Sequence, residues 1–169
     1  MKICIYYRAL SCFAHAYIQS LKKSFDCEIV VIVQNEREFI ELKKRNLDIE
    51  IINVSEYFEN NWNNFTLEKL KNYETKYNCE PIWNIIYTDR FLIFQPYDYC
   101  IKIVCGYFSL YDELFASRQF NYYIDETIAI ASSYIAYIVA TSNKAEYCAE
   151  MLTRGFESQL HYFLKSPMQ

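Results

Sequence analysis

Apolar and polar positions alternate in blocks along the first third of the chain. Three short apolar runs rich in β-branched residues predict strands, at residues 2–7, 28–33 and 49–54. Residues 11–24 and 35–45 carry apolar side chains at helical spacing, with Ser11 and Asn35 as N-caps. The resulting β-α-β-α-β order predicts right-handed crossovers within a parallel sheet.

The middle of the chain is less regular. Residues 55–87 are rich in Asn, Glu and aromatics, and only 69–76 reads as helix, while 60–65 (NNWNNF) reads as loop. A helical pattern then runs from Asp89 to about residue 116, which predicts one long connecting helix along the sheet. Pro96 falls within it, so we expect either a kink or a new helix that starts near this proline.

Alternation returns in the last third of the chain. Residues 120–124 and 145–149 predict two more strands, and Thr127 is the expected N-cap of a buried helix over 128–140. Residues 157–164 predict a last helix. The fold expected from these elements is a three-layer αβα sandwich with a mainly parallel, Rossmann-like sheet of about five strands.

Composition agrees with a single domain over residues 1–169. Hydrophobic residues make up 53% and charged residues 22%, which excludes intrinsic disorder. The net charge of −4 argues against binding of nucleic acid through its phosphates. No apolar run reaches the ~20 residues that span a bilayer.

The seven cysteines contain no CxxC pair, and the two histidines are far from zinc-site spacing. We therefore expect no metal site, and an odd cysteine count suits a reducing cytoplasm. The two glycines, Gly106 and Gly155, allow neither a GxGxxG nor a Walker A motif. A dinucleotide site, a P-loop and a bound cofactor are therefore not expected.

In an open parallel sheet, ligands bind outside the carboxyl ends of the strands. The polar residues expected there are Arg8, Ser11, His15, Asp125, Glu126 and Arg154. Asp125 and Glu126 could supply a general base or bind sugar hydroxyls. Alternatively, one of these two carboxylates stabilises the following helix N-terminus.

The other candidates are equally open. Arg154 is suited to bind a phosphate or carboxylate, or to pair with Glu126 or another acid in a structural bridge. His15 fits a catalytic or a packing role, and Asp89 fits an N-terminal helix charge. Aromatic faces such as those of Trp62 and Trp83 suit stacking on sugar rings, core packing or dimer contacts.

The order of these features resembles the N-terminal domain of bacterial capsular-polysaccharide glycosyltransferases of the GT-B type. The segments that carry the resemblance are MKICIYYRAL (1–10), EPIWNIIYTDRFLIF (80–94), YYIDETIAIASSYIAYIVA (122–140) and MLTRGF (151–156). They cover most of the chain in the expected order.

The resemblance implies an acceptor-side Rossmann-like domain, with Glu126 and Arg154 lining an interdomain cleft. It implies a sugar or lipid-linked saccharide as acceptor, and a protein in the cytoplasm or at the inner face of the membrane. Enzymes of this type bind most of the nucleotide-sugar with a second domain of on the order of 150 residues. We therefore expect hexosyl transfer only when such a domain completes the site.

Two other hypotheses remain open from the sequence. A non-catalytic interaction or regulatory module would explain the missing glycines and the many aromatics, which could form a homodimer. A small-molecule enzyme of flavodoxin-like build would instead bind a flavin or a nucleotide.

Overall fold

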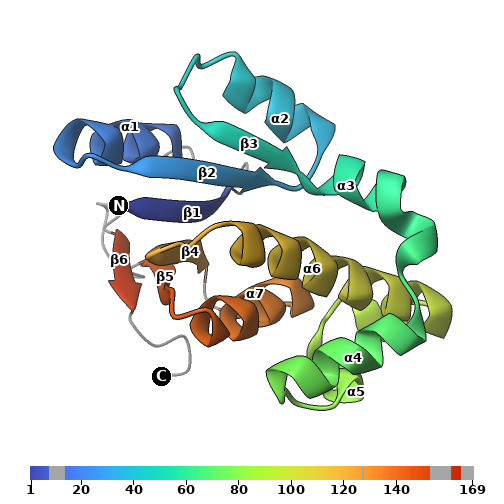
Figure 1. Ribbon diagram of the computed structural model, residues 1–169. Helices are drawn as coiled ribbons and strands as arrows, with labels where there is room; N and C mark the ends of the chain where they lie inside the picture. The colour runs from blue at the N-terminus through green and yellow to red at the C-terminus, as the bar shows by residue number, and fades with distance from the viewer. Residues whose placement is uncertain (8–13, 127, 153–160, 165–169) are drawn as a thin grey trace.

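The computed structural model describes residues 1–7, 14–126, 128–152 and 161–164. Its centre is a six-stranded sheet in the order β3-β2-β1-β4-β5-β6 (Figure 1). The strands are β1 (Lys2–Tyr7), β2 (Glu28–Val33), β3 (Glu50–Asn53), β4 (Tyr122–Glu126), β5 (Glu146–Leu152) and β6 (His161–Leu164). The first five run parallel, and β6 pairs antiparallel with β5.

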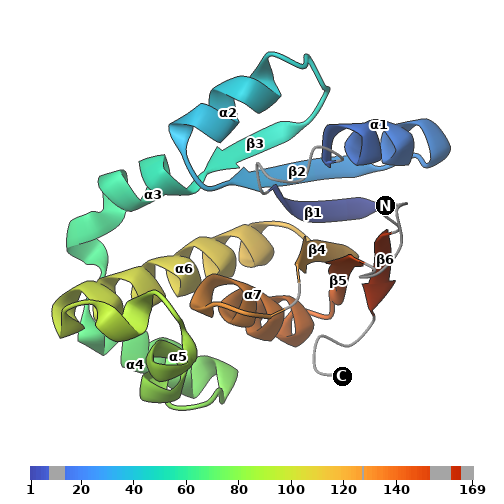
Figure 2. The same ribbon diagram turned by 180° about the vertical axis from the view of Figure 1, so that it is seen from behind.

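Helices cover both faces of this sheet. The helices are α1 (Ala14–Ser24), α2 (Glu36–Lys43), α3 (Val54–Asn61), α4 (Leu67–Tyr77), α5 (Ile82–Thr88), α6 (Tyr97–Ser117) and α7 (Ala131–Ser142), with 3-10 turns η1 (Trp62–Asn64) and η2 (Leu92–Phe94). Helices α1 and α2 lie on one face, and α6 and α7 on the other (Figures 1 and 2). The predicted three-layer, mainly parallel, Rossmann-like sandwich is confirmed.

One side of the sheet, which we call the aliphatic face, packs against α1 and α2. Its buried core is built mainly of branched aliphatic side chains, among them Ile5, Val31, Ile18 and Leu42. The run EIVVIV places alternate residues on opposite faces, and five of its six side chains are buried. A strand covered on both faces needs apolar residues at consecutive positions, which explains why the run is unbroken.

The other side, which we call the aromatic face, packs against α6 and α7. Its core joins rings from the sheet to rings from α6: Tyr111 meets Tyr123 edge-on at 5.8 Å between centroids. Tyr123 in turn lies 5.5 Å from Tyr147 on the next strand. Twelve of the 21 residues of α6 are buried, because this helix lies between the sheet and further helices.

Those further helices form a helical lobe, residues 54–94, between β3 and the start of α6. The lobe lies beyond the carboxyl ends of β1, β2 and β3, alongside the N-terminal half of α6 (Figures 1 and 2). Gly106 lets α6 approach the lobe closely, because a Cβ at this position would lie 2.6 Å from the Phe58 ring and 2.9 Å from Phe65. This close packing against α6 holds the lobe beyond the carboxyl ends of the strands (Figure 1).

Several predicted boundaries need correction. Pro96 does start a new helix, α6, but the segment from Asp89 to residue 95 forms a turn and η2 rather than a continuous helix. The predicted loop at 60–65 is the end of α3 followed by η1. Asn53 caps α3 by accepting the Ser55 N–H at 3.1 Å, so the third strand ends earlier than predicted.

The last predicted helix is wrong in its described part, because residues 161–164 form β6. Pairing with β5 satisfies backbone groups that would otherwise lie at an open sheet edge, and this outweighs local helical spacing. The described part of the β4–α7 connection also differs: Ile130 is extended and α7 begins at Ala131. Thr127, the predicted N-cap, lies outside the described residues.

Candidate functional site

The strand order places the switch point of the sheet, where doubly wound folds form their ligand crevice, between the carboxyl ends of β1 and β4. The chain winds outward from β1 through β2 to β3, and then from β4 to β5, so the order reverses between β1 and β4. Ligands of doubly wound folds bind at such a reversal. Ile124 pairs with Ile5, and Asp125 and Glu126 follow at the end of β4. Both predicted acids therefore lie at this switch point.

Asp125 and Glu126 differ in their surroundings, because successive side chains of a strand point to opposite faces. Asp125 lies on the aromatic face with 2% of its surface exposed. Its Oδ1 accepts the Glu126 N–H at 2.7 Å, and the Tyr123 hydroxyl approaches its Oδ2 at 3.5 Å. Glu126 lies on the opposite side and is half-buried. Glu126 is therefore the better placed of the two to reach a ligand.

Two buried tyrosines, Tyr123 and Tyr111, lie next to Asp125 on the aromatic face. Tyr123 is fully buried and its hydroxyl lies 3.1 Å from that of Tyr111. Burial, and then the neighbouring Tyr111 and Asp125, raise the pKa of Tyr123 well above its usual value. Burial also raises the pKa of the Cys4 thiol, with a further contribution from Asp125. Both groups stay protonated at neutral pH, so neither is an activated nucleophile.

Asp89 has a larger structural role than the sequence indicates. Only 5% exposed, it accepts the N–H groups of Phe91 at 2.7 Å and Leu92 at 2.9 Å through Oδ1. Its Oδ2 accepts the Ala131 N–H at 2.7 Å, at the first turn of α7. This contact joins residues 42 positions apart. A carboxylate at the N-terminus of α7 is therefore that of Asp89.

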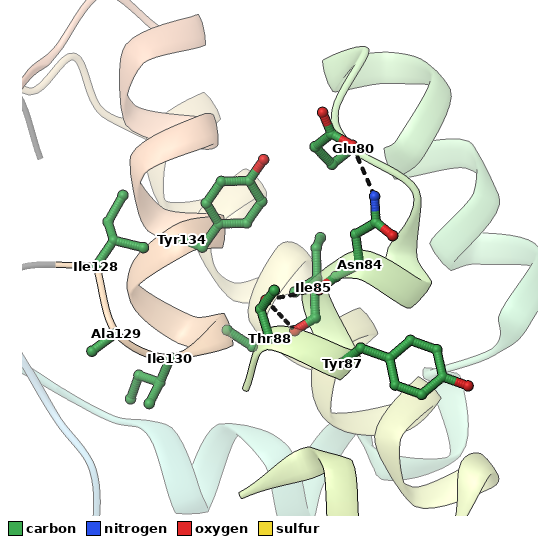
Figure 3. Close-up of a pocket in the computed structure, with 10 residues that line it drawn as sticks. Glu80, Asn84, Ile85, Tyr87, Thr88, Ile128, Ala129, Ile130 and Tyr134 are labelled. Atoms are coloured by element: carbon green, nitrogen blue, oxygen red, sulfur yellow. Dashed lines mark hydrogen bonds between the residues drawn. The ribbon is translucent and has the colours of Figure 1, made fainter. Parts of the chain in front are cut away.

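A cavity of about 440 Å³ lies beside this contact, between α5 and the start of α7 (Figure 3). Ile128, Ala129 and Ile130, which follow Glu126 along the chain, form one wall, and α5 forms the other. Tyr134 and Glu80 point toward one another across the opening (Figure 3). Burial and the Glu80 charge raise the pKa of Tyr134. The cavity is mostly apolar and can take a hydrocarbon portion of a ligand.

A second hollow, of about 510 Å³, lies at the carboxyl ends of β2 and β3 and is called here the Gln34 groove. Its lining includes Gln34, Phe58, Glu59, Trp62, Tyr99 and Tyr107. The sequence predicts ligand binding beyond the carboxyl ends of the strands, but it does not single out Gln34. The sequence offers only a weak indication of the aromatic lining residues. Their rings come from α3, η1 and α6, which only the tertiary structure brings together.

The remaining predicted residues divide between described and undescribed parts of the chain. Arg8, Ser11 and Arg154 lie outside the described residues. His15 is half-buried in the first turn of α1, which follows β1 on the aliphatic face. Of the six candidates, the structure thus brings Asp125 and Glu126 together at the crevice and places His15 on a neighbouring element.

The side chains and helices that the structure describes are those of residues 1–7, 14–126, 128–152 and 161–164. Within these ranges, no three His, Cys, Asp or Glu side chains converge to hold a metal ion. None of the helices they form combines the length and the apolar character that a bilayer crossing requires. The cysteines at 4, 27, 79, 100, 105 and 148 are free thiols.

Comparisons with protein-family models, with curated proteins and with solved structures gave no match to this chain.

Proposed function

We propose that this chain is the acceptor-side domain of a glycosyltransferase in capsular or surface polysaccharide biosynthesis. The observation that carries the proposal is the position of Glu126, half-buried at the strand-order reversal and two residues before Ile128, which lines an apolar cavity. A carboxylate beside mixed polar and apolar space suits an amphipathic acceptor such as a lipid-linked saccharide. The resemblance noted from the sequence supports the same assignment.

In this proposal Glu126 acts as the general base. Its carboxylate takes the proton of an acceptor hydroxyl, and the resulting oxygen attacks the anomeric carbon of the donor sugar. The new C–O bond forms as the bond to the nucleotide phosphate breaks, and the nucleoside diphosphate leaves with the electron pair. A second domain binds the donor, so the chain contributes acceptor binding and the base.

The apolar cavity and the exposed rings near it fit a protein that works in the cytoplasm at the inner face of the membrane. A lipid-linked acceptor would present its saccharide there. The cavity walls from α5 and α7 would hold the first part of the lipid, while the crevice holds the reacting hydroxyl.

The proposal is tested by sugar transfer with the product of the natural reading frame. A panel of nucleotide-sugars and lipid-linked saccharide acceptors is supplied, and product is measured by mass spectrometry. Glu126→Gln should lower the transfer rate by about 10²–10⁴-fold, the usual contribution of a general base. Glu68→Gln, an exposed substitution on α4, is the matched control. Full activity of Glu126→Gln would contradict the role of Glu126, and absence of any transfer would contradict the function.

A second candidate function is a non-catalytic interaction module, and a specific surface favours it. Large apolar side chains are exposed together over residues 83–99, where Trp83 stacks on Tyr97 at 4.8 Å and Phe94 is 83% exposed. Contiguous exposed apolar surface is typical of interaction sites, and a homodimer through this aromatic patch is one arrangement. Light scattering of the wild type and of Phe94→Ser tests it: a monomer in both cases would remove the homodimer.

A further inference from the structure

The Gln34 groove combines three kinds of group that together match the surface of a sugar ring. It offers an anchored amide, a carboxylate and an aromatic wall, all at the same edge of the sheet as Glu126. Its volume of about 510 Å³ is within the range of small-molecule sites. The groove lies outside the cavity between α5 and α7, with which it shares no lining residue.

Gln34 is held in place by five hydrogen bonds. Its N–H donates to Glu38 Oε2 at 2.7 Å, and its carbonyl accepts from both the N–H (3.2 Å) and the hydroxyl (2.8 Å) of Ser55. Its side-chain Oε1 accepts from the hydroxyls of Tyr6 and Tyr107. The amide oxygen is therefore occupied, and the Nε2 hydrogens have no acceptor within the described ranges. Gln34 lines the groove, and a side chain already held in place binds a ligand without losing conformational freedom.

The aromatic wall is fixed as well. Trp62 lies 5.9 Å from Tyr99 between ring centroids, and Phe65 supports it at 6.3 Å. Lys102 donates to the Trp62 carbonyl at 2.9 Å and places its ammonium 5.0 Å from the indole ring. Tyr99 is 42% exposed, so part of the wall remains open to a ligand. Such rings pack against the C–H surface of a pyranose.

Glu59 supplies the hydrogen-bond acceptor of the groove. It is exposed on α3, three residues before Trp62, so both side chains lie on the same side of this segment. Its carboxylate can accept hydrogen bonds from two neighbouring hydroxyls of a sugar. The same negative charge disfavours a phosphate in the groove, which argues against a nucleotide as occupant.

We propose that the Gln34 groove binds a neutral hexopyranose unit. The ring lies against Trp62 and Tyr99, and its hydroxyls bond to Gln34 Nε2 and Glu59. The inference rests on the proposed function only in taking this unit to belong to the acceptor saccharide. The groove and Glu126 both lie at the carboxyl edge of the sheet, the groove at the ends of β2 and β3 and Glu126 at the end of β4.

The positions of the two tryptophans allow ligand binding in the groove to be followed by fluorescence. Trp62 lines it, whereas Trp83 lies in the aromatic patch, so intrinsic fluorescence of Trp83→Phe reports on Trp62 alone. The full chain is titrated with methyl hexopyranosides and short oligosaccharides, with adenosine and uridine diphosphate in parallel. Saccharides should change the fluorescence of the wild type and of Trp83→Phe, and leave that of Trp62→Phe unchanged.

Affinity is then compared across matched variants by saturation-transfer NMR. Trp62→Ala should weaken saccharide binding by about tenfold, and Glu59→Gln by about fivefold. Glu56→Gln, exposed on the same helix but outside the groove lining, and Trp83→Ala should bind as the wild type does. Because Glu59 is exposed, its variant keeps the proposal testable if Trp62→Ala folds poorly.

The possible outcomes separate this inference from the proposed function. Saccharide binding unchanged in Glu59→Gln and in Trp62→Ala, no saccharide binding at all, or tighter binding of the nucleotides in the groove would each overturn the inference. Transfer that depends on Glu126 would still support the proposed function in those cases. Groove-dependent binding without any transfer would support the inference and contradict the function.

Discussion

The two faces of the sheet differ in the side chains that fill them and in what they support. The aliphatic face is closed by two short helices over branched side chains such as Ile18 and Leu42. The aromatic face is closed by a longer layer of helices, with buried rings whose hydroxyls bond to one another, such as Tyr111 and Tyr123. Both hollows described above lie on the side of α6 and α7.

The difference shows where this fold has room for function. Branched aliphatic side chains fill space densely and need no hydrogen-bond partners, so they stabilise the sheet. Rings with hydroxyl groups require hydrogen-bond partners when buried. Meeting that requirement fixes polar groups such as Gln34 and Asp125 at the edge of the sheet, where a ligand can use the neighbouring positions.

If buried polar contacts hold the aromatic side together, Asp89→Asn should have the largest effect. One amide nitrogen would replace a carboxylate oxygen facing a backbone N–H, and the charge-assisted bonds to Leu92 and Ala131 would weaken. We expect the free energy of unfolding in urea to fall by about 2–4 kcal/mol. Asp98→Asn, an exposed acid in the first turn of α6, should cost under about 1 kcal/mol. Equal effects of the two would contradict the bridging role of Asp89.

Close packing of α6 against the lobe is tested by Gly106→Ala. Alanine favours a helix by about 1 kcal/mol, but overpacking against the ring of Phe58 costs about 1–3 kcal/mol. We expect a net loss of about 1 kcal/mol in urea unfolding, partly restored when Phe58→Leu is added.

The matched control for this substitution is on the aliphatic side. Ser20→Ala, at an exposed position of α1, should change the free energy of unfolding by less than about 0.5 kcal/mol. Stabilisation by Gly106→Ala would mean that the lobe moves away from α6 at little cost.

The smallest expected effect is on the pH dependence of the free energy of unfolding, and it differs between the buried tyrosines of the two faces. Burial raises the pKa of Tyr123 on the aromatic face and of Tyr7 on the aliphatic face. The folded protein then keeps protons that the unfolded chain loses above pH 10, so stability is fully present below pH 10 and falls as pH rises. One such group contributes a slope of up to about 1.4 kcal/mol per pH unit.

Unfolding in urea between pH 9 and 11 measures this slope. Tyr123→Phe should make it shallower, and Tyr7→Phe should do so less, because Arg45 partly offsets the effects of burial and Glu41 on Tyr7. Asp125 and Tyr111 act on Tyr123 in the same direction as burial. An unchanged slope in both variants would show that the folded and unfolded proteins ionise these phenols alike.

Part of the site could be predicted from the sequence because strand ends are local features. The acids after the fourth strand were identified from the pattern YYIDE, and the order of elements placed them at the carboxyl edge. The role of Asp89 could not be predicted, since its partner Ala131 is 42 residues away. Gln34 was missed for the same reason, because Tyr107, which holds its side chain, is 73 residues away.

The sequence by itself determined the five parallel strands, the helices that cover the two faces of the sheet, and the start of α6. Hydrophobic periodicity and the conformational restriction by proline both act over a few neighbouring residues, so they can be recognised without the tertiary structure. Only the tertiary structure decided that residues 161–164 pair as a strand, that Asp89 caps α7, and that rings from three elements form the Gln34 groove. These features depend on contacts between distant segments, and such contacts exist only once the chain has packed around its sheet.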